Sequence, residues 1–135
     1  MIERVNTTRT AAHYSDASIF AGRTLMFVSG QVPVDESGSF VPGSASHQTS
    51  LVLRNLGEVL AAAGGSFEDV LSTTVYLLSP EDSDAVRDAR LAVFPSPGPA
   101  STLVYVARLA HPGFLVEISA VAGLSRGRHA PGPPV

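Results

Sequence analysis

Glu117 is the residue of this sequence whose surroundings most strongly suggest chemistry. It interrupts the apolar segment FLVEISAVAG (114–123), in which Val116 and Ile118 flank it on the opposite face of a predicted strand. A carboxylate in apolar surroundings is costly unless it is paired, and burial would raise its pKa toward the range useful for proton transfer. The alternative is a carboxylate that pairs with an arginine across an interface or lies at a wet sheet edge.

Ser29 and Gly30 form the second candidate, at the end of an apolar run in FVSGQVPVD (27–35). A hydroxyl at a strand end, followed by a residue without a Cβ, lets a ligand approach the backbone closely and accept hydrogen bonds from it. An ordinary turn is the alternative. Tyr14, in AHYSDA (12–17), either offers a phenol to a pocket or packs near the terminus.

Arg87 is the third candidate. It lies four residues before Leu91 and seven before Phe94, on one row of a predicted helix, so it is expected to face inward or toward a partner. The alternative is a solvated i,i+3 pair with Asp84, worth roughly a few tenths of a kcal/mol.

The composition excludes several kinds of chemistry. The 135 residues contain no cysteine, which removes thiol nucleophiles and cysteine-ligated metals, and all nine basic residues are arginines, which removes lysine Schiff bases and lysine-anchored pyridoxal phosphate. The four histidines, at 13, 47, 111 and 129, share no metal-ligand spacing. We therefore expect no metal and no cofactor.

Charge and hydropathy also limit the partners. The formal net charge is -3 without a basic cluster, so nucleic acid is an unlikely partner. The chain has no uninterrupted apolar run of about 18 residues, and its first ten residues lack the apolar core of a signal peptide. We expect a cytoplasmic protein that does not interact with membranes.

The elements that must position these residues are predicted in the order strand, strand, helix, strand, helix, strand, strand. A loop over 35–44 precedes the first helix, whose apolar face repeats at helical spacing and which ends at Gly64-Gly65. The second helix begins at the capping sequence Ser79-Pro80 and runs to about Phe94. The predicted strands cover 19–22, 23–29, 70–78, 101–109 and 114–123, and 70–78 is expected to be central.

This order predicts an α+β fold in which two helices cover one face of a mixed sheet. The strands 101–109 and 114–123 are apolar on both faces, which a two-layer monomer does not accommodate, so the open face is expected to pack on other subunits. We predict one domain over 1–123 and a mobile tail over 124–135.

Several segments, in this order, resemble the RidA family, also called YjgF or endoribonuclease L-PSP. They are HYSDA (13–17), FVSGQVPVD (27–35), NLGEVLAAAGGSFEDVLSTTVYL (55–77), PA followed by VARL (99–100 and 106–109), and LVEISAVA (115–122). The resemblance implies a chorismate-mutase-like fold and a homotrimer with small-molecule sites in clefts between subunits. It also implies hydrolysis of reactive enamines and imines, such as 2-aminoacrylate and 2-iminopropionate, to a 2-oxo acid and ammonia.

The resemblance also implies roles for particular residues. Tyr14 and Ser29 would line the pocket, Gly30 would offer close backbone approach, and Glu117 would handle the attacking water and the departing ammonia.

The sequence departs from the family pattern at the substrate-binding positions. Active deaminases read Pro-Ala-Arg-Ser where this chain has Ser101 as the third residue, so the arginine that grips the substrate carboxylate is missing. Leu103 stands where some relatives have cysteine, and Arg87 where asparagine is frequent, so a cation is expected to reach the cleft from another direction. Losing a charged hydrogen bond of roughly 1.5 to 3 kcal/mol makes ordinary amino-acid-derived imines doubtful substrates.

Two functions remain open at this point. One is a deaminase with an altered substrate, and the other is a non-catalytic member that binds a small metabolite or a hydrophobic partner. A ribonuclease role, which the family name suggests, has no support from the charge balance.

Overall fold

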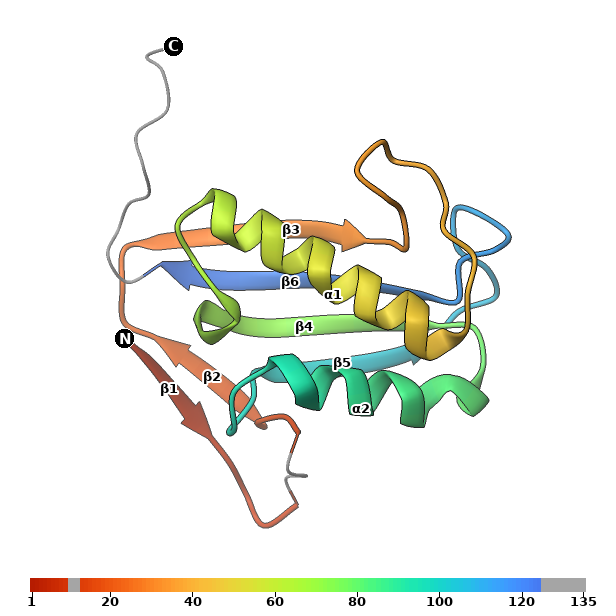
Figure 1. Cartoon of the computed structure of the whole chain (residues 1–135). Coiled ribbons are helices and arrows are strands. Elements are labelled where there is room, and N and C mark those ends of the chain that lie inside the picture. The colour runs from red at the N-terminus through yellow and green to blue at the C-terminus, as the bar shows by residue number, and fades with distance from the viewer. Residues whose placement is uncertain (10–12, 125–135) are drawn as a thin grey trace, which may run out of the picture.

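The computed structural model describes residues 1–9 and 13–124, which form one layer of helices on a mixed β-sheet (Figure 1). The elements are β1 Ile2–Val5, β2 Ala17–Phe20, β3 Thr24–Gln31, α1 Ala45–Ala62, η1 Phe67–Asp69, β4 Val70–Leu77, η2 Pro80–Asp82, α2 Ser83–Val93, β5 Ala100–Tyr105 and β6 Val116–Leu124. Neither helix of these residues is long and apolar enough to cross a membrane.

The main sheet has the strand order β3-β6-β4-β5. Strand β6 is antiparallel to both neighbours, whereas β4 and β5 run parallel, so the sheet is mixed as predicted. Strands β1 and β2 form a separate antiparallel pair. Both helices cover the same face of the main sheet, with α2 beside β5 (Figure 1).

The core lies between the helices and this face of the sheet. Alternate residues of β4 and β6 point into it, because strand side chains alternate between faces. Helix α1 contributes Val52, Leu53, Leu56 and Leu60. It begins at the N-cap Ser44, whose hydroxyl accepts a hydrogen bond from the His47 amide, and ends before Gly64, which has a φ of 79°.

The opposite face of the sheet is covered by neither of the two described helices and carries exposed apolar side chains. Phe27 and Leu25 on β3 are 75% and 53% exposed. This agrees with the expectation of an apolar open face, while its burial by other subunits stays a prediction.

The structure corrects several of the predicted elements. Strand β1 was not predicted, and β2 and β3, although consecutive, pair with different strands. Strand β5 ends at Tyr105 rather than 109, because its partner β4 ends at Leu77 and leaves the following residues without a strand to pair with. Strand β6 includes the buried Leu124, which was assigned to the tail, and the rest of that predicted tail lies outside the described residues.

Candidate functional site

A β-bulge at Ser29 and Gly30 replaces the strand end predicted there. Strand β3 continues to Gln31, but its pairing with β6 shifts: Val28 is opposite Ala120 and Gln31 is opposite Ile118. Two residues of β3 therefore lie opposite one residue of β6. Bulges of this kind redirect side chains and are frequent beside active sites.

The carboxylate of Glu117 fills the space over Gly30. A Cβ atom added to Gly30 would overlap Oε2 of Glu117 and would lie 2.6 Å from its Cδ. The bare backbone predicted to admit a ligand is thus already covered by a side chain of the same chain. The structure brings these two predicted site residues together, and only glycine leaves room for this arrangement.

Glu117 is half-buried on an interior strand, since β6 lies between β3 and β4. The alternative that placed it at a wet sheet edge is therefore wrong. It is paired in register with Tyr76. Among the described residues no ion pair or hydrogen bond engages its carboxylate, so the carboxylate oxygens remain available to accept a proton from a bound water.

Ser29 is exposed and precedes Gly30 in the bulge. Its carbonyl oxygen accepts a hydrogen bond from Nε2 of Gln31 at 3.1 Å. A hollow of about 180 Å³ lies on the same open face of the sheet and includes Phe27, Thr74 and Ser119 in its lining. Ser119 shares the face of Glu117, two residues further along β6.

On the helix side of the sheet, Ser101 belongs to a buried polar cluster. Its hydroxyl lies 3.1 Å from Oγ1 of Thr73, its partner in the parallel pairing of β4 and β5. Nη2 of Arg90, on α2, donates hydrogen bonds to both hydroxyls, at 2.9 Å to Thr73 and 2.8 Å to Ser101. The position where deaminases are expected to carry an arginine thus holds a serine bound to an arginine from another element.

Arg90 was not predicted as a site residue. It is 3% exposed, and burial lowers the pKa of its guanidinium to about 10, so it stays charged at neutral pH. A usable signal was its spacing of four residues from both Val86 and Phe94. That spacing places it on the buried row of α2.

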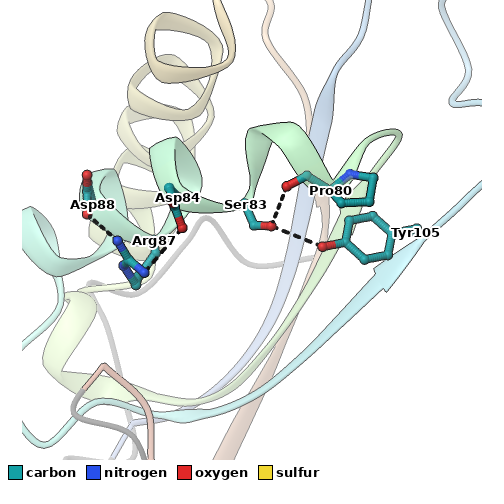
Figure 2. Close-up of polar contacts among 6 residues, drawn as sticks. All are labelled: Pro80, Ser83, Asp84, Arg87, Asp88 and Tyr105. Carbon is teal, nitrogen blue, oxygen red and sulfur yellow. Dashed lines mark hydrogen bonds and ion pairs between the residues drawn. The ribbon is translucent and has the colours of Figure 1, made fainter.

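Arg87 forms ion pairs with two residues of its own helix, α2 (Figure 2). Its Nη1 lies 3.3 Å from Asp84 Oδ1, and its Nη2 lies 3.3 Å from Asp88 Oδ1. The solvated pair with Asp84 is therefore present. Of the row that Arg87 shares, Phe94 is buried whereas Leu91 is 50% exposed, and an approach of Arg87 to a partner subunit stays a prediction. Pairs of this exposed kind contribute roughly 0 to 1 kcal/mol.

A second hollow, of about 170 Å³, lies between α2 and β5. Its lining includes Arg87, Arg90, Leu103 and His13. Burial lowers the pKa of the His13 imidazole, and the positive charges of Arg90 and Arg87 lower it further. Both effects favour the neutral form of the imidazole.

Tyr14 follows His13, and the two rings pack edge to face with centroids 5.1 Å apart. The next residue, Ser15, fixes this segment against the turn before β5. Its amide donates to the carbonyl of Pro99 and its hydroxyl donates to the carbonyl of Gly98. Tyr14 is thereby held at the β5 side of the molecule, with the group around the second hollow.

The predicted site residues thus form two groups, on opposite faces of the sheet. Thr73, which contacts Arg90, is buried beneath the helices, whereas Tyr76, opposite Glu117, is three residues away on the same strand and faces the other side. One chain alone does not place the carboxylate of Glu117 and the cations of α2 in one cavity.

Comparison with known proteins gives a consistent result over nearly the whole chain. Residues 5–124 match the family model described as endoribonuclease L-PSP. A RutC family protein of Pyrococcus horikoshii is 38% identical over 118 residues, which are 87% of this chain and 91% of that protein. The human protein named 2-iminobutanoate/2-iminopropanoate deaminase is 37% identical over 127 residues, 90% of each chain.

Solved structures agree with the fold. A Rid-family protein of unknown function from Yersinia pestis gives a TM-score of 0.80 at 28% identity, covering 91% of this chain and 98% of that one. RidA from the Antarctic bacterium Psychrobacter gives a TM-score of 0.71 at 29% identity, covering 90% and 94%. The chain therefore belongs to the endoribonuclease L-PSP family, also called the RidA or YjgF family.

Proposed function

We propose that this protein hydrolyses a reactive imine or enamine to a carbonyl compound and ammonia, with an altered substrate because Ser101 replaces the usual arginine. The observation that carries the proposal is the carboxylate of Glu117, held against Gly30 without a partner among the described residues. Relatives 37% to 39% identical, from human and rat among others, are named 2-iminobutanoate/2-iminopropanoate deaminase, which supports the reaction class.

In this proposal Glu117 acts as a general base and then as a general acid. It takes a proton from a water molecule as the water oxygen bonds to the imine carbon, and it gives this proton to the nitrogen, which forms a carbinolamine. It then takes the proton of the carbinolamine hydroxyl and gives it to the amino nitrogen, as the carbon–oxygen double bond forms and the carbon–nitrogen bond breaks. The products are a carbonyl compound and ammonia, so the reaction consumes one water and needs no redox partner. General acid–base catalysis of this kind contributes roughly 10² to 10⁴-fold.

The complete site is proposed to form between two subunits of a homotrimer. Glu117, Ser29 and Gly30 come from the open face of one subunit, and Tyr14, Arg87, Ser101 and Leu103 from the β5 edge of its neighbour. Their placement on opposite faces of the sheet and the exposed Phe27 support this arrangement. A cytoplasmic location stays a prediction from the sequence.

The alternative is a family member that binds a small metabolite without converting it. The observation in its favour is Ser101, whose hydroxyl is occupied by Thr73 and Arg90 and offers no charge of its own to an anionic substrate.

Ammonia release from freshly generated 2-iminopropionate separates the two functions. We expect slow release by the wild type, because the usual arginine is missing, and a further loss of at least about 100-fold in Glu117→Gln, which keeps the shape but not the base. Glu58→Gln, an exposed carboxylate on α1, is the matched control and should act like wild type. Turnover that survives Glu117→Gln would refute the mechanism, and a wild type that binds the product without releasing ammonia would favour the alternative.

A further inference from the structure

Arg90 is a buried cation that has no acidic partner in the part of the chain that the structure describes. The ion pairs of the described residues join Arg54 to Glu58 and Arg87 to Asp84 and Asp88, and none of them includes Arg90. A buried charge is strongly unfavourable unless hydrogen bonds and an opposite charge compensate it. Its position therefore requires an explanation that packing alone does not provide.

The hydrogen bonds of Arg90 satisfy only part of its guanidinium. Both of those made with described residues come from Nη2 and end on neutral hydroxyls, of Thr73 and Ser101. Nε is buried and has no hydrogen-bond partner among the described residues. The side chain is thus fixed in place with donor capacity left over, and the Phe94 ring lies beneath it, 5.9 Å from its Cζ.

The same guanidinium lines the hollow of about 170 Å³ beside α2, where Arg87 supplies a second cation. The acid in this wall, Asp84, has an 84% exposed side chain and is held by Arg87 rather than Arg90. A volume of 170 Å³ corresponds to roughly six water-sized groups at about 30 Å³ each. The hollow is therefore large enough for a small organic acid.

We propose that Arg90 is the residue that binds the carboxylate of a small 2-oxo or 2-imino acid in this hollow, and that Arg87 exchanges its ion pairs for the bound anion. The inference rests on the proposed function, since it assigns the anionic end of the substrate to that same inter-subunit site. Ser101 then acts through Arg90 as a positioning residue, because its hydroxyl fixes Nη2.

Pyruvate binding tests the inference without relying on turnover. Titration of the wild-type protein followed by calorimetry should show binding of pyruvate and at least tenfold weaker binding of pyruvamide, which has the same shape but no charge. Arg90→Met should weaken pyruvate binding at least tenfold and leave pyruvamide binding unchanged. Arg54→Met, an exposed arginine of α1 in an ion pair, is the matched control and should bind like wild type.

The folding of the variant is checked separately. Replacing an uncompensated buried charge by an apolar side chain of similar volume is frequently neutral or stabilising, so Arg90→Met should unfold at the wild-type temperature or above. If Arg90→Met does not fold, Arg87→Met, at an exposed position, should still weaken pyruvate binding about two- to fivefold and reduce its dependence on salt. Unchanged affinity in the variant that folds would overturn the inference.

Failure of this inference is distinguishable from failure of the proposed function. A wild type that binds pyruvate through Arg90 but releases no ammonia from 2-iminopropionate would refute hydrolysis and keep the anion site. Ammonia release that is unaffected by Arg90→Met at low substrate concentration would refute the anion site and keep hydrolysis.

Discussion

Gly30→Ala is the substitution that tests most directly how the bulge of β3 holds the carboxylate of Glu117. The added Cβ would overlap Oε2 and lie 2.6 Å from Cδ and 2.9 Å from Cγ of Glu117. Carbon atoms in contact are normally about 3.5 to 4.0 Å apart, so the carboxylate must move by roughly 1 Å. A misplacement of that size can cost about 10²-fold in rate, so we expect kcat for ammonia release to fall about 100-fold.

The backbone itself should tolerate this alanine, because Gly30 is not among the glycines with positive φ. We therefore expect a stability change within about 1 kcal/mol, measured by urea denaturation, and KM within about threefold of wild type. Gly38→Ala is the matched control. Gly38 has a φ of 83° and nothing near its missing Cβ, so alanine there should strain the turn and leave kcat unchanged.

A double mutant distinguishes displacement of the carboxylate from a general disturbance of the sheet. If Gly30→Ala acts only through Glu117, adding it to Glu117→Gln should reduce ammonia release no further, because residues in contact are not additive. Wild-type kcat in folded Gly30→Ala would refute the reasoning. A further large loss in the double mutant would also refute it, since Gly30 would then have a role of its own.

Two more substitutions test the proposed subunit interface and the role of Arg90 as the substrate-binding cation. Phe27→Glu places a charge at a position whose side chain is 75% exposed in one chain, so the monomer should stay folded. Light scattering should show loss of the trimer, because the charge would be buried in the proposed interface. An unchanged mass would argue against the open face as the interface. Ser101→Arg places a second guanidinium beside Arg90, whose Nη2 lies 2.8 Å from the Ser101 hydroxyl. Like charges about 4 Å apart repel by about 4 kcal/mol at an effective dielectric constant of 20. We expect Ser101→Arg to lower the unfolding temperature without raising ammonia release, and a gain in activity would show that Arg90 is not the substrate cation.

The predictable parts of the fold are those set by local chemistry. The boundaries of α1 follow from the capping hydroxyl of Ser44 and the glycines after Ala63, and both are visible in the sequence. The extent of β5 is not, because it depends on where β4 stops, and strand pairing is a non-local property. The pairing of β1 with β2 escaped prediction for the same reason.

The candidate site was also predictable only in part. Glu117 was identified because a carboxylate in an apolar strand is unusual, and the structure places it on Gly30, another predicted residue. Arg90 was not predicted, because the prediction placed the helical row of Arg87, Leu91 and Phe94 inward instead. The helical spacing of Arg90 from Val86 and Phe94 was the stronger physical signal, since it places a charge on the buried row of α2.

Strand parity explains why the proposed active site cannot be complete in one chain. Thr73 and Tyr76 are three residues apart on β4, so Thr73 points to the helices and Tyr76 to the open face. Arg90 donates a hydrogen bond to Thr73, and Glu117 is paired with Tyr76, so Arg90 and Glu117 also lie on opposite faces. No side-chain rotation carries a group through a hydrogen-bonded sheet. A substrate that needs both the carboxylate of Glu117 and a cation from α2 must therefore sit between two copies of the chain. On this reasoning, a variant that is monomeric but fully folded should retain each half of the site and lose turnover.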